Sequence, residues 1–129
     1  MRTRSTLHRR RRASAQVATR LRHELAEWAR RTGASADMIC DIVLSTYEAM
    51  ANAVKHAYPP NTVGPLELRA ELDRDTIVIT VVDHGCWRQP DRHAPARGLA
   101  LIRALSHRAA VVPGPHGTAV RMSWPTSTP

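Results

Sequence analysis

The stretch PLELRAELDRDTIVITVV, residues 65–82, decides the fold because its hydrophobic period changes partway along the chain. In residues 65–72 apolar and charged side chains alternate, which predicts a strand with one buried face. Residues 76–82 are rich in β-branched side chains and apolar on both faces, as in a central strand. DRD, residues 73–75, separates the two runs as a turn. We therefore expect an antiparallel hairpin.

Two helices are predicted before this hairpin. Apolar residues recur every three or four positions over residues 13–32, and Gly33 is a typical residue at a helix end. Ser35 suits the N-cap of a second helix over residues 36–57. Pro59 would stop that helix.

Shorter elements are expected after the hairpin. Residues 84–97 form a polar loop with two prolines, and residues 98–106 form an amphipathic helix. Residues 107–112 are a weak strand, and residues 118–124 alternate again as the last strand. Because helices and strands are grouped rather than strictly alternating, the order indicates an α+β fold, a two-layer α/β sandwich.

The length and charge fit one domain with a basic extension. The chain has 129 residues and a formal net charge of +8, and six arginines lie within residues 1–12, MRTRSTLHRRRR. We expect those residues to be a disordered arm, residues 13–124 to be the domain, and residues 125–129 to be a short tail. No segment reaches the roughly 20 apolar residues that span a bilayer, and no secretory signal is recognisable, which favours the cytoplasm.

One polar motif lies on the second predicted helix. YEAMANAVKHAY, residues 47–58, places Glu48 and Asn52 four positions apart, so they share a helix face, which we expect to point away from the core. Three glycine segments follow in order: DHG after the central strand, RGLAL at a helix start, and GTAVRM before the last strand. Each alone is a common turn, but together and in this order they are much less common.

These segments resemble the GHKL ATPase superfamily. Within it they resemble the small bacterial anti-sigma-factor serine/threonine kinases, which carry a histidine-kinase-like ATPase domain. EAMANAVKHAY resembles the N-box of that family, while VVDHG, RGLALIRAL and HGTAVRM resemble its three glycine boxes. The resemblance covers residues 13–124 and implies the Bergerat fold, with a mixed, mainly antiparallel sheet.

The resemblance implies ATP and Mg²⁺ as cofactors and two residues for the chemistry. Asn52 would ligate Mg²⁺ through its side-chain oxygen, a hard ligand suited to a hard ion that also holds the ATP phosphates. Glu48 would be the catalytic general base that removes the proton from an attacking hydroxyl.

The resemblance also implies five further nucleotide-binding residues. Asp83 would accept a hydrogen bond from the adenine amino group, and Gly85 would let the backbone pass close to the base. Thr118 would support the adenine through its hydroxyl. Arg97 and Gly98 would border the phosphates beside a lid of residues 86–97.

The resemblance implies a kinase that phosphorylates an anti-anti-sigma (STAS-type) protein. It also implies a sigma factor as a second partner and is compatible with a homodimer. Two positions depart from the family pattern, because Trp87 and Ala100 stand where glycines are usual. They support an alternative, a regulatory binding module of the same fold with weakened or lost ATP binding.

Two other classes of function have less support. RHEL, residues 22–25, resembles the start of a phosphoacceptor motif of histidine kinases, but its usual proline is missing. His23 also lies too close to Asn52 to leave space for a dimerisation hairpin. A nucleic-acid binder could use the arginine arm, but the chain has no Phe and two Tyr, which argues against an aromatic stacking surface.

Overall fold

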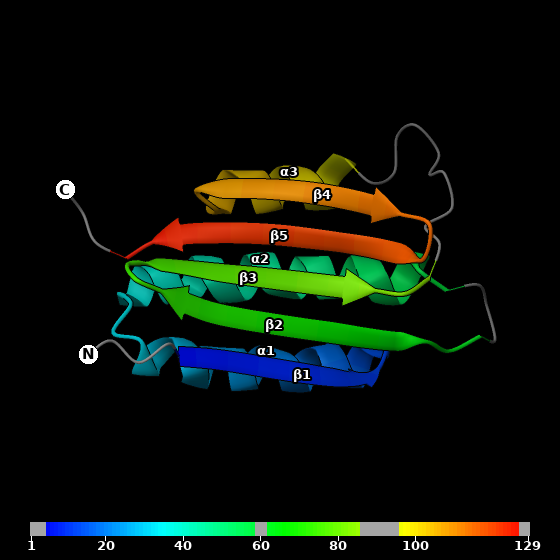
Figure 1. The fold of residues 1–129 in the computed structure, drawn as a ribbon, viewed down its shortest axis with the longest axis horizontal. Coiled ribbons are helices and arrows are strands. Elements are labelled where there is room, and N and C mark those ends of the chain that lie inside the picture. The colour runs from blue at the N-terminus through cyan, green and yellow to red at the C-terminus, as the bar shows by residue number, and fades with distance from the viewer. Residues whose placement is uncertain (1–4, 59–61, 86–95, 127–129) are drawn as a thin grey trace.

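A computed structural model describes residues 5–58, 62–85 and 96–126 of the chain, the first three residues of the last range by their backbone alone. Eight elements follow one another in the order shown in Figure 1. They are β1 (Ser5–Arg12), α1 (Ala15–Arg31), α2 (Ala36–His56), β2 (Pro65–Asp73), β3 (Thr76–Asp83), α3 (Ala96–Leu105), β4 (Arg108–Gly114) and β5 (Gly117–Pro125).

The strands form one sheet in the order β1-β2-β3-β5-β4. All three helices lie on one face of the sheet, and the other face carries no helix in the described part of the chain (Figure 1). This arrangement confirms the predicted two-layer α+β sandwich. The sheet was expected to be mixed and mainly antiparallel, and every pairing between the described strands is antiparallel.

The hairpin predicted from residues 65–82 is present as β2 and β3. Leu66 pairs with Asp83 at one end of the ladder and Asp73 with Thr76 at the other, where Arg74 adopts a left-handed conformation with φ of 58°. β3 lies between β2 and β5, as its apolar composition predicts for a central strand.

The prediction that residues 1–12 form a disordered arm is wrong for residues 5–12. These residues form β1, an edge strand paired along its whole length with β2. Leu7 is 6% exposed in the core, and the indole N–H of Trp28 donates to Ser5 Oγ at 3.1 Å. The arginines are compatible with this strand because charged side chains protect an exposed sheet edge from pairing with other chains.

Of the two long helices, α2 starts at the predicted residue and α1 starts two residues after its predicted start. Ser14 caps α1 by accepting the Val17 N–H at 3.0 Å, and Ser35 caps α2 by accepting the Met38 N–H at 3.1 Å. Gly33 has φ of 83°, a conformation that glycine adopts without steric cost. No helix in the described ranges is long and apolar enough to cross a membrane.

The hydrophobic core lies between the helices and the sheet. The largest fully buried side chains come from both layers: Trp28, Leu21, Leu25, Ile42, Met50, Leu66, Leu68, Ile77, Ile79, Ile102, Met122 and Val81. Because residues of one strand alternate between faces, each strand directs every second residue into this layer.

Thr46 is a polar exception in the core. It is fully buried on α2, and its hydroxyl has no hydrogen-bond partner among the described residues. A buried hydroxyl without a partner costs about 1–3 kcal/mol, whereas a methyl group of the same shape does not. We expect Thr46→Val to raise the free energy of unfolding by about 1 kcal/mol, measured by urea denaturation.

Thr19, a half-buried threonine on α1, provides the control for this prediction. Thr19→Val should change the free energy of unfolding by less than about 0.5 kcal/mol. Destabilisation by Thr46→Val would show that the Thr46 hydroxyl does have a partner in solution.

Candidate functional site

Asp83 and Thr118 meet at one end of the sandwich. Asp83 ends β3, Thr118 begins β5, and the two residues pair directly across the ladder. Asp83 is 2% exposed and Thr118 is 6% exposed. Both continue the alternating series of buried residues along their strands, so both belong to the sheet face that the helices cover. The structure therefore brings together a carboxylate and a hydroxyl that are far apart in the sequence.

Two glycines make close approaches beside this pair. A Cβ on Gly85 would overlap the carbonyl oxygen of Ala57 at the end of α2, so only glycine fits there. Gly117 has φ of 151°, and a Cβ on it would overlap the carbonyl oxygen of Asp83. Gly85 was expected to approach a bound base, and in the structure its close neighbour is the backbone of α2.

The turn that contains Gly85 is tied to the Asp83 carboxylate. The backbone N–H of Gly85 donates to Asp83 Oδ1 at 3.1 Å. This bond fixes one carboxylate oxygen relative to the strand end.

Glu48 and Asn52 lie one turn apart on α2, and both are half-buried. Neither residue belongs to the buried stripe of α2, which includes Ile42, Ala49 and Ala53. Lys55 and His56 follow at the end of the helix and are exposed.

Arg97 and Gly98 lie in the first turn of α3, as the sequence predicts for a segment at a helix start. The first backbone N–H groups of a helix have no partner within the helix and can meet phosphate oxygens. Ala100 is exposed on the same helix. Trp87 and most of the expected lid, residues 86–95, lie outside the described residues.

Sequence reasoning assigned no role to Tyr58, which lies beside the site. Its hydroxyl donates to the Pro65 carbonyl oxygen at 2.5 Å and accepts the His84 backbone N–H at 3.0 Å. Burial, with the nearby charge of Asp83, raises the pKa of Tyr58 above its ordinary value. The available signal was its place as the last residue of the motif YEAMANAVKHAY.

A second polar group lies on the sheet face that carries no helix. Glu67 is 4% exposed and pairs with His8 Nε2 at 2.5 Å, Arg69 Nη2 at 2.9 Å and His84 Nε2 at 3.5 Å. Burial alone would raise the pKa of Glu67, but the hydrogen bonds from His8 and Arg69 outweigh it and lower the pKa. Glu67 therefore links His8 on β1 to His84, the residue that follows Asp83.

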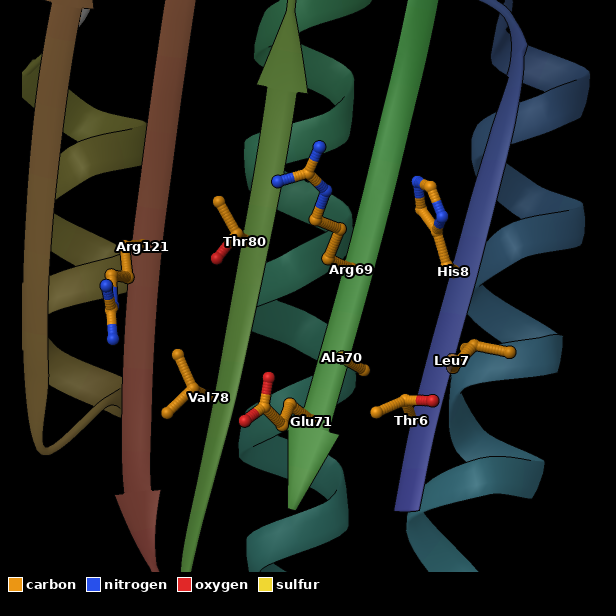
Figure 2. A pocket seen from close by; sticks show the side chains of 9 residues that line it. All are labelled: Thr6, Leu7, His8, Arg69, Ala70, Glu71, Val78, Thr80 and Arg121. Carbon is orange, nitrogen blue, oxygen red and sulfur yellow. The ribbon is translucent and has the colours of Figure 1, made fainter. Parts of the chain in front are cut away.

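A shallow hollow of about 340 Å³ lies on the same open face (Figure 2). Figure 2 shows Arg69, Glu71, Thr80 and Arg121 projecting from neighbouring strands around it. Asp83 and Thr118 belong to the helix-covered face, so this hollow is separate from the predicted nucleotide site. Within the described ranges, no cluster of three or more His, Cys, Asp or Glu side chains could hold a metal ion by itself.

The fold, with its α2 motif and the glycine turns that flank β3 and β5, defines a GHKL-type ATPase domain. The family model described as "Histidine kinase-like ATPase domain" matches residues 11–124. The chain belongs to this family, as the motifs predict.

The chain is also similar to individual serine-protein kinases. The chain is 40% identical over 74 residues to the serine-protein kinase RsbW of Staphylococcus epidermidis, and that stretch covers 57% of this chain and 46% of the relative. Identity to the RsbW of Staphylococcus aureus strain JH9 is 39% over 74 residues, with the same coverage. The matched stretch thus spans less than half the length of these relatives.

A solved structure extends the likeness to nearly the whole chain. The crystal structure of the RsbU and RsbW domains of Rv1364c from Mycobacterium tuberculosis superposes with a TM-score of 0.79 at 30% sequence identity. It covers 96% of this chain and 33% of that one.

Proposed function

We propose that this protein is an ATP-binding anti-sigma factor and serine/threonine kinase that phosphorylates an anti-anti-sigma (STAS-type) partner in the cytoplasm. The observation that carries the proposal is the buried Asp83–Thr118 pair, enclosed by two glycines that admit no side chain. The likeness to RsbW serine-protein kinases supports the kinase activity. A sigma factor as second partner and a homodimer belong to the same proposal.

The residues present fit ATP. Asp83 offers a carboxylate oxygen at a nearly closed position, where a hydrogen bond from the adenine amino group discriminates strongly against bases without one. Thr118, on the adjacent strand, would support the same edge of the base. Arg97 and the backbone N–H of Gly98, at the start of α3, would border the phosphates.

Phosphoryl transfer depends mainly on positioning and charge neutralisation. Glu48 would take the proton from the substrate hydroxyl as its oxygen bonds to the γ-phosphorus and the bond to ADP breaks. The amide oxygen of Asn52 would hold Mg²⁺, which neutralises phosphate charge when bound with ATP. Both residues are half-buried on one turn of α2, so solvent reaches them only in part.

Asn52→Ala tests the nucleotide site directly. We expect it to weaken ATP binding at least about tenfold in Mg²⁺ and to change binding little in EDTA, because the lost contact is to the metal ion. Isothermal titration calorimetry measures both conditions. Lys55→Ala, an exposed change one turn further along α2, is the control and should bind like the wild type. Equal Mg²⁺-dependent affinity in Asn52→Ala and wild type would remove Asn52 from the metal site.

The second candidate is a regulatory binding module that no longer transfers phosphate. Trp87 and Ala100, which replace two glycines of the family pattern, favour it. A folded wild type that binds no ATP in the same calorimetry would support this candidate and overturn the kinase.

A further inference from the structure

Tyr58 connects three segments that the chain brings together at the end of α2. Its hydroxyl uses both of its hydrogen-bonding roles, as donor to Pro65 at the start of β2 and as acceptor from His84 after β3. A tyrosine hydroxyl is protonated at neutral pH and can donate, and burial raises the pKa of Tyr58 further in the same direction.

The ring of Tyr58 occupies a slot against two glycines. A Cβ on Gly64 would overlap Cε1 and Cζ of the ring. A Cβ on Gly85 would lie 2.9 Å from Cδ1 of the ring. The two glycines therefore allow the ring to lie against both the β2 start and the turn after β3. Figure 1 shows the end of α2 beside the tip of β3, where this contact occurs.

The turn after β3 is held through two successive backbone N–H groups. The His84 N–H bonds to the Tyr58 hydroxyl at 3.0 Å, and the Gly85 N–H bonds to Asp83 Oδ1 at 3.1 Å. Since Asp83 is bound to the same turn that Tyr58 anchors, movement of the turn would carry the carboxylate oxygen with it. The hydroxyl of Tyr58 thus acts on Asp83 through the backbone.

We propose that Tyr58 is a positioning residue for adenine recognition, whose hydroxyl holds the Asp83–Gly85 turn so that the Asp83 carboxylate meets the amino group of the base. This inference rests on the proposed ATP site. Tyr58 itself need not touch the nucleotide. Its removal should therefore affect one contact of the base and leave the phosphate contacts unchanged.

Tyr58→Phe keeps the ring in its slot and removes only the hydroxyl. Binding of two nucleotides is measured by calorimetry in Mg²⁺: ATP, and purine riboside triphosphate, which lacks the 6-amino group. We expect Tyr58→Phe to weaken ATP binding about tenfold and to change purine riboside triphosphate binding less than about twofold. In an Asp83→Asn background, Tyr58→Phe should have little further effect, because both changes remove the same contact.

Tyr47→Phe is the matched control. Tyr47 is a half-buried tyrosine on α2 whose ring lies 4.8 Å from Arg22 Cζ, and its variant should bind both nucleotides like the wild type. Thermal melting checks that each variant folds. Hydrogen exchange of the His84 amide in the wild type provides a second measurement that needs no variant, and this amide should be protected.

The outcomes separate this inference from the proposed function. Equal weakening of both nucleotides by Tyr58→Phe would make Tyr58 a structural residue only, and unchanged ATP binding would remove its role altogether. An unprotected His84 amide would also overturn the inference, since the anchoring bond would be absent. A folded wild type that binds no ATP would overturn the ATP site as well.

Discussion

Replacing Glu48 by alanine should lower phosphate transfer by orders of magnitude while leaving ATP bound. A general base contributes about 10²–10⁴-fold to such a reaction, and transfer should fall by a factor in this range. Binding should persist because Asp83, Thr118 and Asn52, which are proposed to hold the nucleotide, are unchanged. The measurement is transfer of labelled γ-phosphate to a candidate STAS-domain protein, with calorimetry of ATP binding in parallel.

Glu27→Ala is the control for this prediction. Glu27 is an exposed glutamate on α1 whose ion pairs with Arg30 and Arg31 lie on the surface, so its loss should leave transfer unchanged. Glu48→Gln should behave like Glu48→Ala, since an amide keeps the size of the side chain but accepts no proton at neutral pH. Retained transfer in either variant would assign the base to another residue.

The parts of the fold that were predicted correctly depend on local sequence. The β2–β3 hairpin and the two long helices each carry their own hydrophobic period and their own turn or cap, so neighbouring residues suffice to identify them. β1 could not be identified in this way. Its contacts with β2 join residues far apart in the sequence, such as His8 and Glu67, whose side chains are hydrogen-bonded across 59 positions. Arginines also conceal its single core residue, Leu7.

In the candidate site too, local sequence identified some features, whereas others depend on contacts between distant segments. Asp83 and Thr118 were each placed beside a predicted strand, but their pairing across β3 and β5 was not predicted, because the two residues lie far apart in the sequence. Tyr58 escaped sequence reasoning because its role requires Gly64 and Gly85 against its ring, and only the folded chain brings these together.

Leu7→Ala should destabilise the protein by about 2–4 kcal/mol, although it lies in the arginine-rich segment that the sequence presents as a solvated arm. Leu7 is 6% exposed within the core, and truncating a buried leucine costs both transfer free energy and a cavity. Urea denaturation gives the change in the free energy of unfolding. The neighbouring change Thr6→Ala should cost less than about 1 kcal/mol, because Thr6 is exposed on the opposite face of β1.

Equal and negligible effects of Leu7→Ala and Thr6→Ala would mean that residues 5–12 leave the sheet in solution.

If the expected difference is found, deleting residues 1–12 cannot serve as a clean test of a nucleic-acid arm. The deletion would also remove β1, expose the edge of β2 and leave the Trp28 indole without Ser5. Arg10→Glu and Arg12→Glu, both at exposed positions of β1, would then isolate the charge. Their effect on binding to any acidic partner should shrink as salt is raised, whereas the effect of Leu7→Ala on stability should persist, because salt screens exposed charges and leaves the burial of an apolar side chain in place.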